Sequence, residues 1–318
     1  MRLDFAPMEG ITGAAFRRCH KKYFGGIDRY YAPFISPSGD HVFTKRDKLE
    51  IYPEYNEGYE LVPQLMAKNA DDFLWAAGEL AAMGYESVNL NAGCPSGTVT
   101  AKGKGAGMLS DVVALDAFLE KIFDKASCRI SVKTRLGMND PEEFWDVLEV
   151  YNKYPISELI IHPRVRKDFY REKPRMEYFA AAVEKANMPI SFNGGIVSDA
   201  DCRKIMEEFP NLEAVMLGQG IVADPFLAEK VKGISKPDVK VLREFHGELF
   251  ESYAQQFQSR NNAATRMKEL WHYFVQLFGD SEKLGKVIKK AKNAEEFLSV
   301  TETVFREKPL LERSAGNW

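Results

Sequence analysis

The chain has 318 residues, of which 45% are hydrophobic and 28% are charged, which is typical of a globular protein with one large domain or one large and one small domain. Its formal net charge of -3 gives no overall indication of a nucleic-acid partner, and no apolar run approaches the roughly 20 residues that a membrane helix requires. Four cysteines without a CxxC pair argue against disulfides and zinc, so we expect a cytoplasmic protein with reduced thiols and no metal.

Short apolar runs recur along the first two thirds of the chain, and segments with helical periodicity separate them. The expected strands are residues 3–8, 28–35, 60–67, 87–93, 129–137, 158–165, 188–195 and 213–220. Helices are expected between them, for example at 71–84 and 141–154. Continuous apolar strands that alternate with helices require a parallel sheet covered on both faces. The pattern therefore predicts a (β/α)8 TIM barrel over residues 1–233.

After Gly233 the strand signals stop, and the chain shows only helical periodicity. We expect helices at 239–257, 263–279 and 294–305, which would form a small helical domain over residues 238–318. Residues 236–313 carry 14 Lys and Arg against 12 Asp and Glu, and the segment KLGKVIKKAK at 283–292 holds five of these lysines. This segment is either a solvated helix face or a surface for nucleic-acid phosphates.

The carboxyl ends of the strands carry unusual polar residues, and this end of a TIM barrel holds the active site. These residues are Glu9, Gln64, Asn91, Cys94, Lys133, Arg135, His162, Arg164, Asn193 and Gln219. A buried lysine such as Lys133 is costly unless an anion meets it, so it faces either a ligand or a structural carboxylate. Glycines after the last two strands predict a phosphate site, whereas Ser198 and Asp199 are expected to be helix caps.

The segment NLNAGCPSGTVTAKGKGAGML at 89–109 places the thiol of Cys94 at the end of a strand, before a glycine-rich loop that we expect to be mobile. Glycines 103–107 are a weak indication of a dinucleotide site, because they lie ten residues past their strand. Cys94 could be a packed core residue, a nucleophile or a proton donor. Its Gly-Cys-Pro setting argues against the core, and no histidine is adjacent in sequence to activate a nucleophile.

Together these motifs resemble those of a known family. APMEGIT, NLNAGCPSGTV, KTRLG, IIHPRVRKDFY and NGGI stand in the order and spacing of the tRNA-dihydrouridine synthases, and the resemblance covers nearly the whole chain. That resemblance implies a flavoprotein with a TIM barrel and a helical domain. It also implies reduction of a uridine in tRNA to 5,6-dihydrouridine with FMN and NADPH, or NADH in its place.

The resemblance also assigns roles to single residues. It implies FMN contacts at Pro7, Met8, Glu9, Gln64, Lys133 and His162, and phosphate contacts at Asn193, Gly194, Gly195, Gly218 and Gln219. It implies uracil contacts at Asn91, Arg135 and Tyr170, and makes Cys94 the proton donor. Two departures stand out: Gln219 occupies a position where the family commonly has arginine, and HPRVR replaces the usual HGRTR.

The implied chemistry suits these residue types. Saturating the C5=C6 bond of uracil needs a hydride at C6, from flavin N5, and a proton at C5. A thiol stays protonated near neutral pH, where a carboxylic acid would already have ionised. Lys133 would stabilise negative charge on the N1–C2=O edge of a reduced flavin, and His162 could donate there or be a core histidine. A uridine inside tRNA must leave its stack, and the helical domain would bind the RNA phosphates.

Three other interpretations remain open from the residues. A flavin barrel could act on a free pyrimidine, as dihydroorotate or dihydropyrimidine oxidoreductases do. Lys133 could form the Schiff base of a flavin-free aldolase or isomerase. The chain could also be an RNA-binding protein without catalysis, although Cys94 and Lys133 argue against this. We expect a monomer without membrane association.

Overall fold

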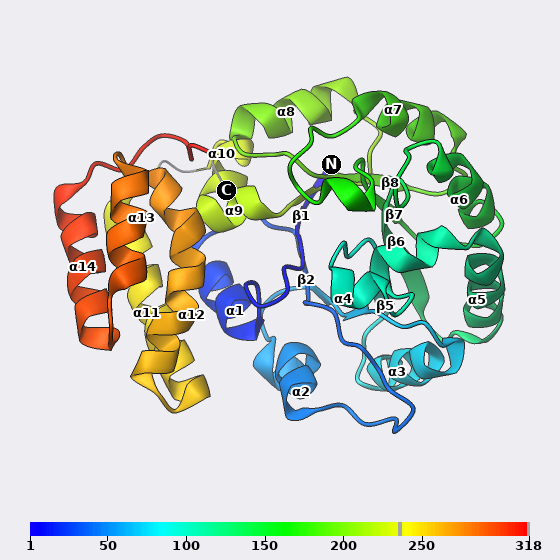
Figure 1. Ribbon diagram of the computed structural model, residues 1–318, viewed down its shortest axis with the longest axis horizontal. Helices are drawn as coiled ribbons and strands as arrows, with labels where there is room; N and C mark the ends of the chain where they lie inside the picture. The colour runs from blue at the N-terminus through cyan, green and yellow to red at the C-terminus, as the bar shows by residue number, and fades with distance from the viewer. Residues whose placement is uncertain (235–236, 317–318) are drawn as a thin grey trace.

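The computed structural model describes residues 1–234 and 237–316, in which parallel strands form one ring surrounded by helices (Figure 1). The strands are β1 (Arg2–Phe5), β2 (Arg29–Tyr31), β3 (Leu61–Val62), β4 (Gln64–Leu65), β5 (Ser87–Ala92), β6 (Arg129–Arg135), β7 (Leu159–His162), β8 (Ile190–Asn193) and β9 (Ala214–Leu217). Their order is β3-β2-β1-β9-β8-β7-β6-β5-β4. The predicted TIM barrel is confirmed.

Strands β3 and β4 are the two ends of this order, and only Pro63 separates them. Proline has no N–H to donate to a neighbouring strand, which interrupts the ladder at this residue. The Pro63 carbonyl nevertheless accepts a bond of 2.9 Å from the Asn89 N–H, so the ring continues through it. The two short strands are thus the single strand predicted at 60–67.

Helices accompany the strands, and most of them cover the outside of the barrel, whereas the short α4 is drawn inside the ring beside β5 (Figure 1). They are α1 (Ala14–Tyr23), α2 (Lys45–Ile51), α3 (Ala70–Ala82), α4 (Gly97–Thr100), α5 (Val112–Lys125), α6 (Glu143–Tyr151), α7 (Met176–Lys185), α8 (Asp199–Glu208), α9 (Gln219–Ala223) and α10 (Leu227–Lys232). Short 3-10 helices are η1 (Pro53–Tyr55), η2 (Gly105–Ser110) and η3 (Arg166–Asp168). Ser198 caps α8 in a reciprocal pair with Asp201, as the capping interpretation of this segment expected, whereas Asp199 is the first helical residue.

Four helices follow the barrel and lie together on one side of it, next to α1 and α9 (Figure 1). They are α11 (Val239–Phe257), α12 (Arg260–Phe274), α13 (Ser281–Lys290) and α14 (Ala294–Glu307), with the 3-10 helix η4 (Val275–Leu277) after α12. Helix α12 ends earlier than the predicted 263–279, because the chain tightens into η4. The domain boundary between 233 and 238 stays a prediction, and residues 317–318 of the predicted domain lie outside the described residues.

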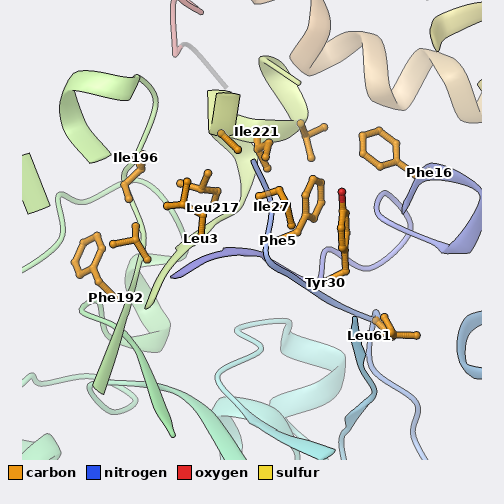
Figure 2. Close-up of a cluster of buried hydrophobic side chains, with 14 of the residues drawn as sticks. Leu3, Phe5, Phe16, Ile27, Tyr30, Leu61, Phe192, Ile196, Leu217 and Ile221 are labelled. Carbon is orange, nitrogen blue, oxygen red and sulfur yellow. The ribbon is translucent and has the colours of Figure 1, made fainter. Parts of the chain in front are cut away.

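The main core lies between the barrel wall and the helices, because alternate strand residues point to opposite faces. In β1, Leu3 and Phe5 are fully buried in this layer, where Phe16 of α1 joins them (Figure 2). Met216 of β9 instead points into the barrel, where it joins a small apolar cluster that includes Tyr31. None of the described helices is both long and apolar enough to span a bilayer.

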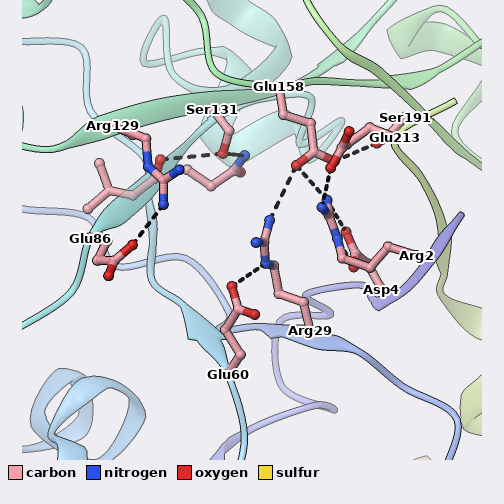
Figure 3. A network of polar contacts seen from close by, with 12 residues as sticks. Arg2, Asp4, Arg29, Glu60, Glu86, Arg129, Ser131, Glu158, Ser191 and Glu213 are labelled. Atoms are coloured by element: carbon pink, nitrogen blue, oxygen red, sulfur yellow. Dashed lines mark hydrogen bonds and ion pairs between the residues drawn. The ribbon is translucent and has the colours of Figure 1, made fainter.

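A network of charges closes the amino-terminal end of the barrel (Figure 3). The Arg2 guanidinium contacts Asp4 at 2.8 Å and Glu158 at 2.7 Å, and the side chains of both acids are buried. It also reaches the half-exposed Glu213 at 2.6 Å, while Arg29 lies 3.5 Å from Glu158. Burial raises the pKa of Asp4 to about 7 even though Arg2 opposes the shift. This end of the barrel holds structural charges, and the opposite end holds the candidate site.

Candidate active site

Two adjoining cavities, of about 460 and 250 Å³, lie at the carboxyl ends of the strands. Asn193, Gly194, Gly195 and Gly218 line the larger one; Glu9, Gln64, Asn91, Cys94 and Arg135 line the smaller one; Pro7, Met8, Lys133, His162, Tyr170 and Gln219 line both. Every residue that the sequence analysis assigned to the site is therefore at one end of the barrel. The larger volume falls within the range of small-molecule sites, although the role of each residue stays a prediction.

Strand register explains why these side chains meet. In the parallel pairing of β5 with β6, Asn91 lies opposite Lys133, and in the pairing of β6 with β7, Arg135 lies opposite His162. A slip of one residue would turn each of these side chains to the other face of the sheet. The continuous buried ladder of the barrel thus determines the spacing of the polar groups.

Hydrogen bonds to the backbone of Cys94 and of its neighbour Gly93 hold the thiol-bearing segment in place. The Oδ1 atom of Asn91 accepts from the N–H groups of Gly93 at 3.1 Å and Cys94 at 2.9 Å, and the Cys94 carbonyl accepts from the Ala106 N–H at 3.1 Å. The side chain of Cys94 is half-buried. Burial raises the pKa of its thiol, an effect that the neighbouring charges of Arg135 and Lys133 only partly oppose. The thiol therefore keeps its proton at neutral pH.

A chain of amides inside the barrel orients Asn91 in turn. Asn91 donates from Nδ2 to Gln64 Oε1 at 2.8 Å, and Gln64 donates from Nε2 to Asn89 Oδ1 at 2.8 Å. Asn89 then donates to the Ser131 hydroxyl at 2.8 Å. Because each amide satisfies the next, the flip state of Asn91 is determined and its Oδ1 must face the Cys94 backbone. Gln64 and Asn91 thus position the thiol, in addition to the ligand contacts predicted for them.

The wall shared by the two cavities is strongly cationic. Burial, and secondarily the charge of Arg135, lowers the pKa of Lys133 to about 7, and within the described residues no carboxylate forms an ion pair with it. The structural ion pair considered for Lys133 is therefore not found there. His162 lies beside it, buried, with Nε2 2.6 Å from Arg164 Nη1. An arginine can only donate, so His162 accepts at Nε2, is neutral and carries its proton on Nδ1.

Arg135 connects two loops at the mouth of the site. Its side chain is 1% exposed, and it donates from Nε to the Gly93 carbonyl at 3.0 Å. From Nη1 it donates to the carbonyls of Val165 at 3.1 Å and Phe169 at 2.8 Å, and its guanidinium lies 5.2 Å from the centre of the Tyr170 ring. Arg135 therefore holds the Cys94 loop and the Tyr170 loop together. Its predicted contact with uracil is compatible with this role and stays a prediction.

Comparison with known families agrees with this geometry. The family model described as "Dihydrouridine synthase (Dus)" matches residues 4–313. The chain belongs to the dihydrouridine synthase family. As a member, it is a flavin-dependent oxidoreductase, the class that the sequence analysis expected, and the Schiff-base aldolase alternative is not supported.

Relatives within the family share about a quarter of their residues with the chain. It is 26% identical over 242 residues to tRNA-dihydrouridine synthase B of Pasteurella multocida, covering 76% of this chain and 72% of the relative. It is 28% identical over 242 residues to tRNA-dihydrouridine(16) synthase of Ralstonia nicotianae, with 73% of each covered. A probable tRNA-dihydrouridine synthase of Staphylococcus aureus is 29% identical over 263 residues, covering 78% of this chain and 77% of the relative.

Solved structures with the same fold are more distant in sequence. A histamine dehydrogenase from Rhizobium sp. 4-9 superposes with a TM-score of 0.55 at 13% identity, covering 73% of this chain and 45% of that one. Morphinone reductase in complex with tetrahydroNAD superposes with a TM-score of 0.50 at 12% identity, covering 76% of this chain and 89% of that one. These similarities show the barrel fold alone.

Among the lining residues that the sequence analysis did not single out is Tyr273 of α12. Tyr273 lies at the smaller cavity, and its hydroxyl forms a side-chain hydrogen bond with Gln219. From the same helix, Arg266 Nη1 donates to the Gly10 carbonyl at the end of β1. Helix α12 therefore reaches the rim of the site, and Gln219 is tied to it. No motif marked Tyr273, because it lies far along the chain in a segment that shows only helical periodicity.

The loop after Cys94 is more ordered than its glycine content suggested. Residues 105–109 form most of η2, are buried, and pack against the end of β5. Gly105 has φ +57, and an added Cβ there would lie 2.9 Å from the Cβ of Cys94. Glycine is thus needed at this position so that the loop can pass directly beside the thiol. Movement of the loop during substrate entry stays a prediction.

We predict that Gly105→Ala displaces the thiol without damaging the cofactor cavity. The new methyl group would overlap Cys94, so kcat for uridine reduction should fall at least tenfold while flavin affinity remains unchanged. Gly103→Ala is the matched control, because Gly103 has a similar φ of +66 but its added Cβ would meet only the flexible Lys68 side chain, at 3.5 Å. Equal kcat losses in the two variants would show that backbone strain, and not contact with Cys94, is responsible.

Proposed function

We propose that this protein reduces the C5=C6 bond of a uridine in tRNA to 5,6-dihydrouridine, with bound FMN and with NADPH, or NADH, as reductant. The observation that carries the proposal is the lining of the smaller cavity. There a protonated thiol, whose backbone N–H is held by Asn91, shares the cavity with Lys133, in a chain of the dihydrouridine synthase family. The named relatives are tRNA-dihydrouridine synthases, which supports tRNA as the substrate.

The residues of the cavities fit FMN. The cationic wall would meet the electron-rich N1–C2=O edge of the ring, and the glycines after β8 and β9 would admit the phosphate close to the backbone. When bound, FMN supplies a hydride from its N5 to C6 of the uracil. Lys133 would then stabilise the negative charge that the reduced ring carries, because few other groups screen charge in this enclosed site.

Cys94 completes the reduction by giving its proton from Sγ to C5. Its raised pKa keeps the proton in place until negative charge develops on the neighbouring carbonyl of the base. Asn91 and Gly105 determine where the sulfur lies, and the Tyr170 ring at the mouth is half-exposed, so it can contact an incoming base. The target base must be swung out of folded RNA, which costs a few kcal/mol.

The helical segment after residue 238 would bind the tRNA. On α13 and just after it, Lys283, Lys286, Lys289, Lys290 and Lys292 are exposed. Lys286 pairs with Glu282 at 2.6 Å, and among the described residues the other four form no ion pair with a carboxylate. Unpaired lysines on one short segment favour phosphate contacts over a self-neutralised surface. Contact between α12 and the site rim would connect this RNA surface to the chemistry.

The test compares tRNA with free pyrimidines. Protein loaded with FMN is mixed with NADPH and tRNA isolated from a strain that lacks the gene, and dihydrouridine is measured by nucleoside mass spectrometry. We expect product and NADPH consumption that depend on tRNA, and sequencing would identify the modified position. Efficient turnover of free uracil or dihydroorotate without any need for tRNA would support the alternative, an oxidoreductase of free pyrimidines.

Lys133 predicts how flavin affinity changes with pH. Burial lowers its pKa to about 7, so above pH 7 it is neutral and must take up a proton to pair with the electron-rich edge of the ring. The Kd for FMN should therefore rise between pH 7 and 9, by up to about tenfold per unit, while the phosphate stays dianionic. Lys133→Met should abolish this pH dependence and slow flavin reduction by NADPH. A wild-type Kd that is flat over this range would contradict the prediction.

A further inference from the structure

The structure contains a second buried cation in the larger cavity, Arg164, to which the proposed reaction gives no role. Its side chain follows β7, and the residue is 7% exposed. Nη1 donates to His162 Nε2 at 2.6 Å and Nε donates to the Glu172 carbonyl at 2.5 Å. Among the described residues no carboxylate forms an ion pair with it, so the guanidinium is held in place by neutral acceptors. A buried cation without an anion is costly, which indicates that a ligand supplies the missing charge.

The guanidinium faces the glycine turn that follows β8. A Cβ added to Gly194 would lie 3.4 Å from Arg164 Nη1, and one added to Gly195 would lie 4.0 Å from Nη2. Both glycines have positive φ, +128 and +70, and a Cβ on Gly194 would also meet His162 Cδ2 at 2.8 Å. The turn thus leaves space beside the arginine that any side chain would fill. An anion at this turn would lie against the guanidinium.

The end of β9 cannot supply the same charge. Gln219 is the side chain that β9 presents at its carboxyl end, and this neutral side chain bonds to Tyr273 of α12. Besides Lys133 and Arg164, two other cations line the larger cavity, Arg171 and Lys173. Both are exposed side chains on a surface loop that also carries Glu172. Arg164 is therefore the one buried arginine lining this cavity among the described residues, and its position is preorganised by two hydrogen bonds.

We propose that Arg164 binds the phosphate of the flavin mononucleotide and replaces the charge that the end of β9 lacks. This inference rests on the proposed function, because it takes FMN to be the ligand of the larger cavity. The planar guanidinium can offer N–H donors to a phosphate oxygen from Nη2, in the geometry that favours arginine for phosphate recognition. The N–H groups of the glycine turn would provide further donors to the dianion.

The experiment compares FMN with riboflavin, which lacks the phosphate. Apoprotein is titrated with each flavin, and the Kd is obtained from the quenching of flavin fluorescence. For Arg164→Met we expect FMN to bind between about tenfold and a hundredfold more weakly, while riboflavin affinity changes less than about threefold. Lys167→Ala is the matched control, because Lys167 is an exposed cation on the same loop that lines neither cavity, and it should alter neither Kd.

Two further variants separate phosphate binding from a merely structural role. Gln219→Arg in the Arg164→Met background should restore FMN affinity at least in part, because it places a cation at the end of β9. Arg164→Lys should lose less FMN affinity than Arg164→Met, because it keeps the charge. Equal losses for FMN and riboflavin, or no loss for either, would overturn the assignment. A wild-type protein that binds neither flavin would overturn the proposed function itself, and is thereby distinguishable from failure of this inference.

Discussion

Replacing Cys94 with alanine is expected to lower the rate of dihydrouridine formation by a factor of about 10² to 10⁴, the contribution typical of a positioned general acid. The thiol carries its proton at neutral pH because burial raises its pKa, and the backbone of Cys94 is held by the Asn91 side chain and by the Ala106 N–H. FMN affinity and NADPH oxidation in the absence of tRNA should be unchanged, since neither needs the proton. Single-turnover mass spectrometry of the tRNA measures the loss.

Cys128→Ala provides the control for this prediction. Cys128 is also a half-buried free thiol, but it lies between α5 and β6, at the opposite end of the barrel. Its removal should leave dihydrouridine formation within about twofold of the wild type. If Cys94→Ala still produced dihydrouridine at the wild-type rate, the proton would have to come from another group or from water, and the assignment of Cys94 would be wrong.

Arg2→Ala should destabilise the fold by about 3–5 kcal/mol, the cost typical of removing one partner from a buried ion pair. The substitution would leave the side chains of Asp4 and Glu158, 0% and 5% exposed, without the cation that both contact (Figure 3). Arg29, 3.5 Å from Glu158, could compensate only in part. Denaturant titration followed by circular dichroism should show a lower midpoint with an unchanged slope.

The Arg2 effect should depend on pH in a defined direction. The pKa of Asp4 in the folded protein is raised to about 7 from its ordinary value of 3.8, so Asp4 favours folding at low pH and this contribution is lost as pH rises through 7. Without Arg2 the folded pKa would rise further. The destabilisation by Arg2→Ala should therefore be larger at pH 8 than at pH 6, because the unpaired carboxylate can be protonated at the lower pH.

Glu213→Ala tests whether the large destabilisation expected for Arg2→Ala is due to the burial of Asp4 and Glu158. Glu213 contacts the same guanidinium at 2.6 Å, but its side chain is 45% exposed, so its removal should cost no more than about 1 kcal/mol. A loss as large as that of Arg2→Ala would mean that the exposed pair carries the stability of the network. A loss below about 1 kcal/mol for both variants would contradict the structural role of the amino-terminal network altogether.

The two ends of the barrel have separate tasks. At the amino-terminal end, acids and arginines neutralise one another over short distances, which stabilises the ring. At the carboxyl end, Lys133 and Arg164 have no acidic partner among the described residues, so this positive charge is available to a ligand. That contrast is the electrostatic reason for placing the chemistry at the carboxyl end.

The sequence by itself determined the barrel and the residues at its active end. Apolar runs with polar residues near their carboxyl ends, such as Gln64, Cys94, Lys133 and His162, can be recognised locally. In a parallel barrel the carboxyl ends of all strands lie at the same end, which is where the active site forms. The motifs around Cys94 also indicated the family correctly. Even the interruption at Pro63 left the predicted third strand in its place.

Only the tertiary structure decided which atoms of these residues touch. Tyr273 reaches the site because α12 packs against α9, and Gly105 is needed because its loop folds back onto Cys94. Likewise, Arg164 lies next to the glycines after β8 because the carboxyl ends of β7 and β8 are neighbours in the barrel. Such contacts join segments that lie far apart or turn back on themselves, so local periodicity carries no record of them. Local patterns in the sequence thus determine where the strands lie, whereas the packing of distant segments determines the contacts within the site.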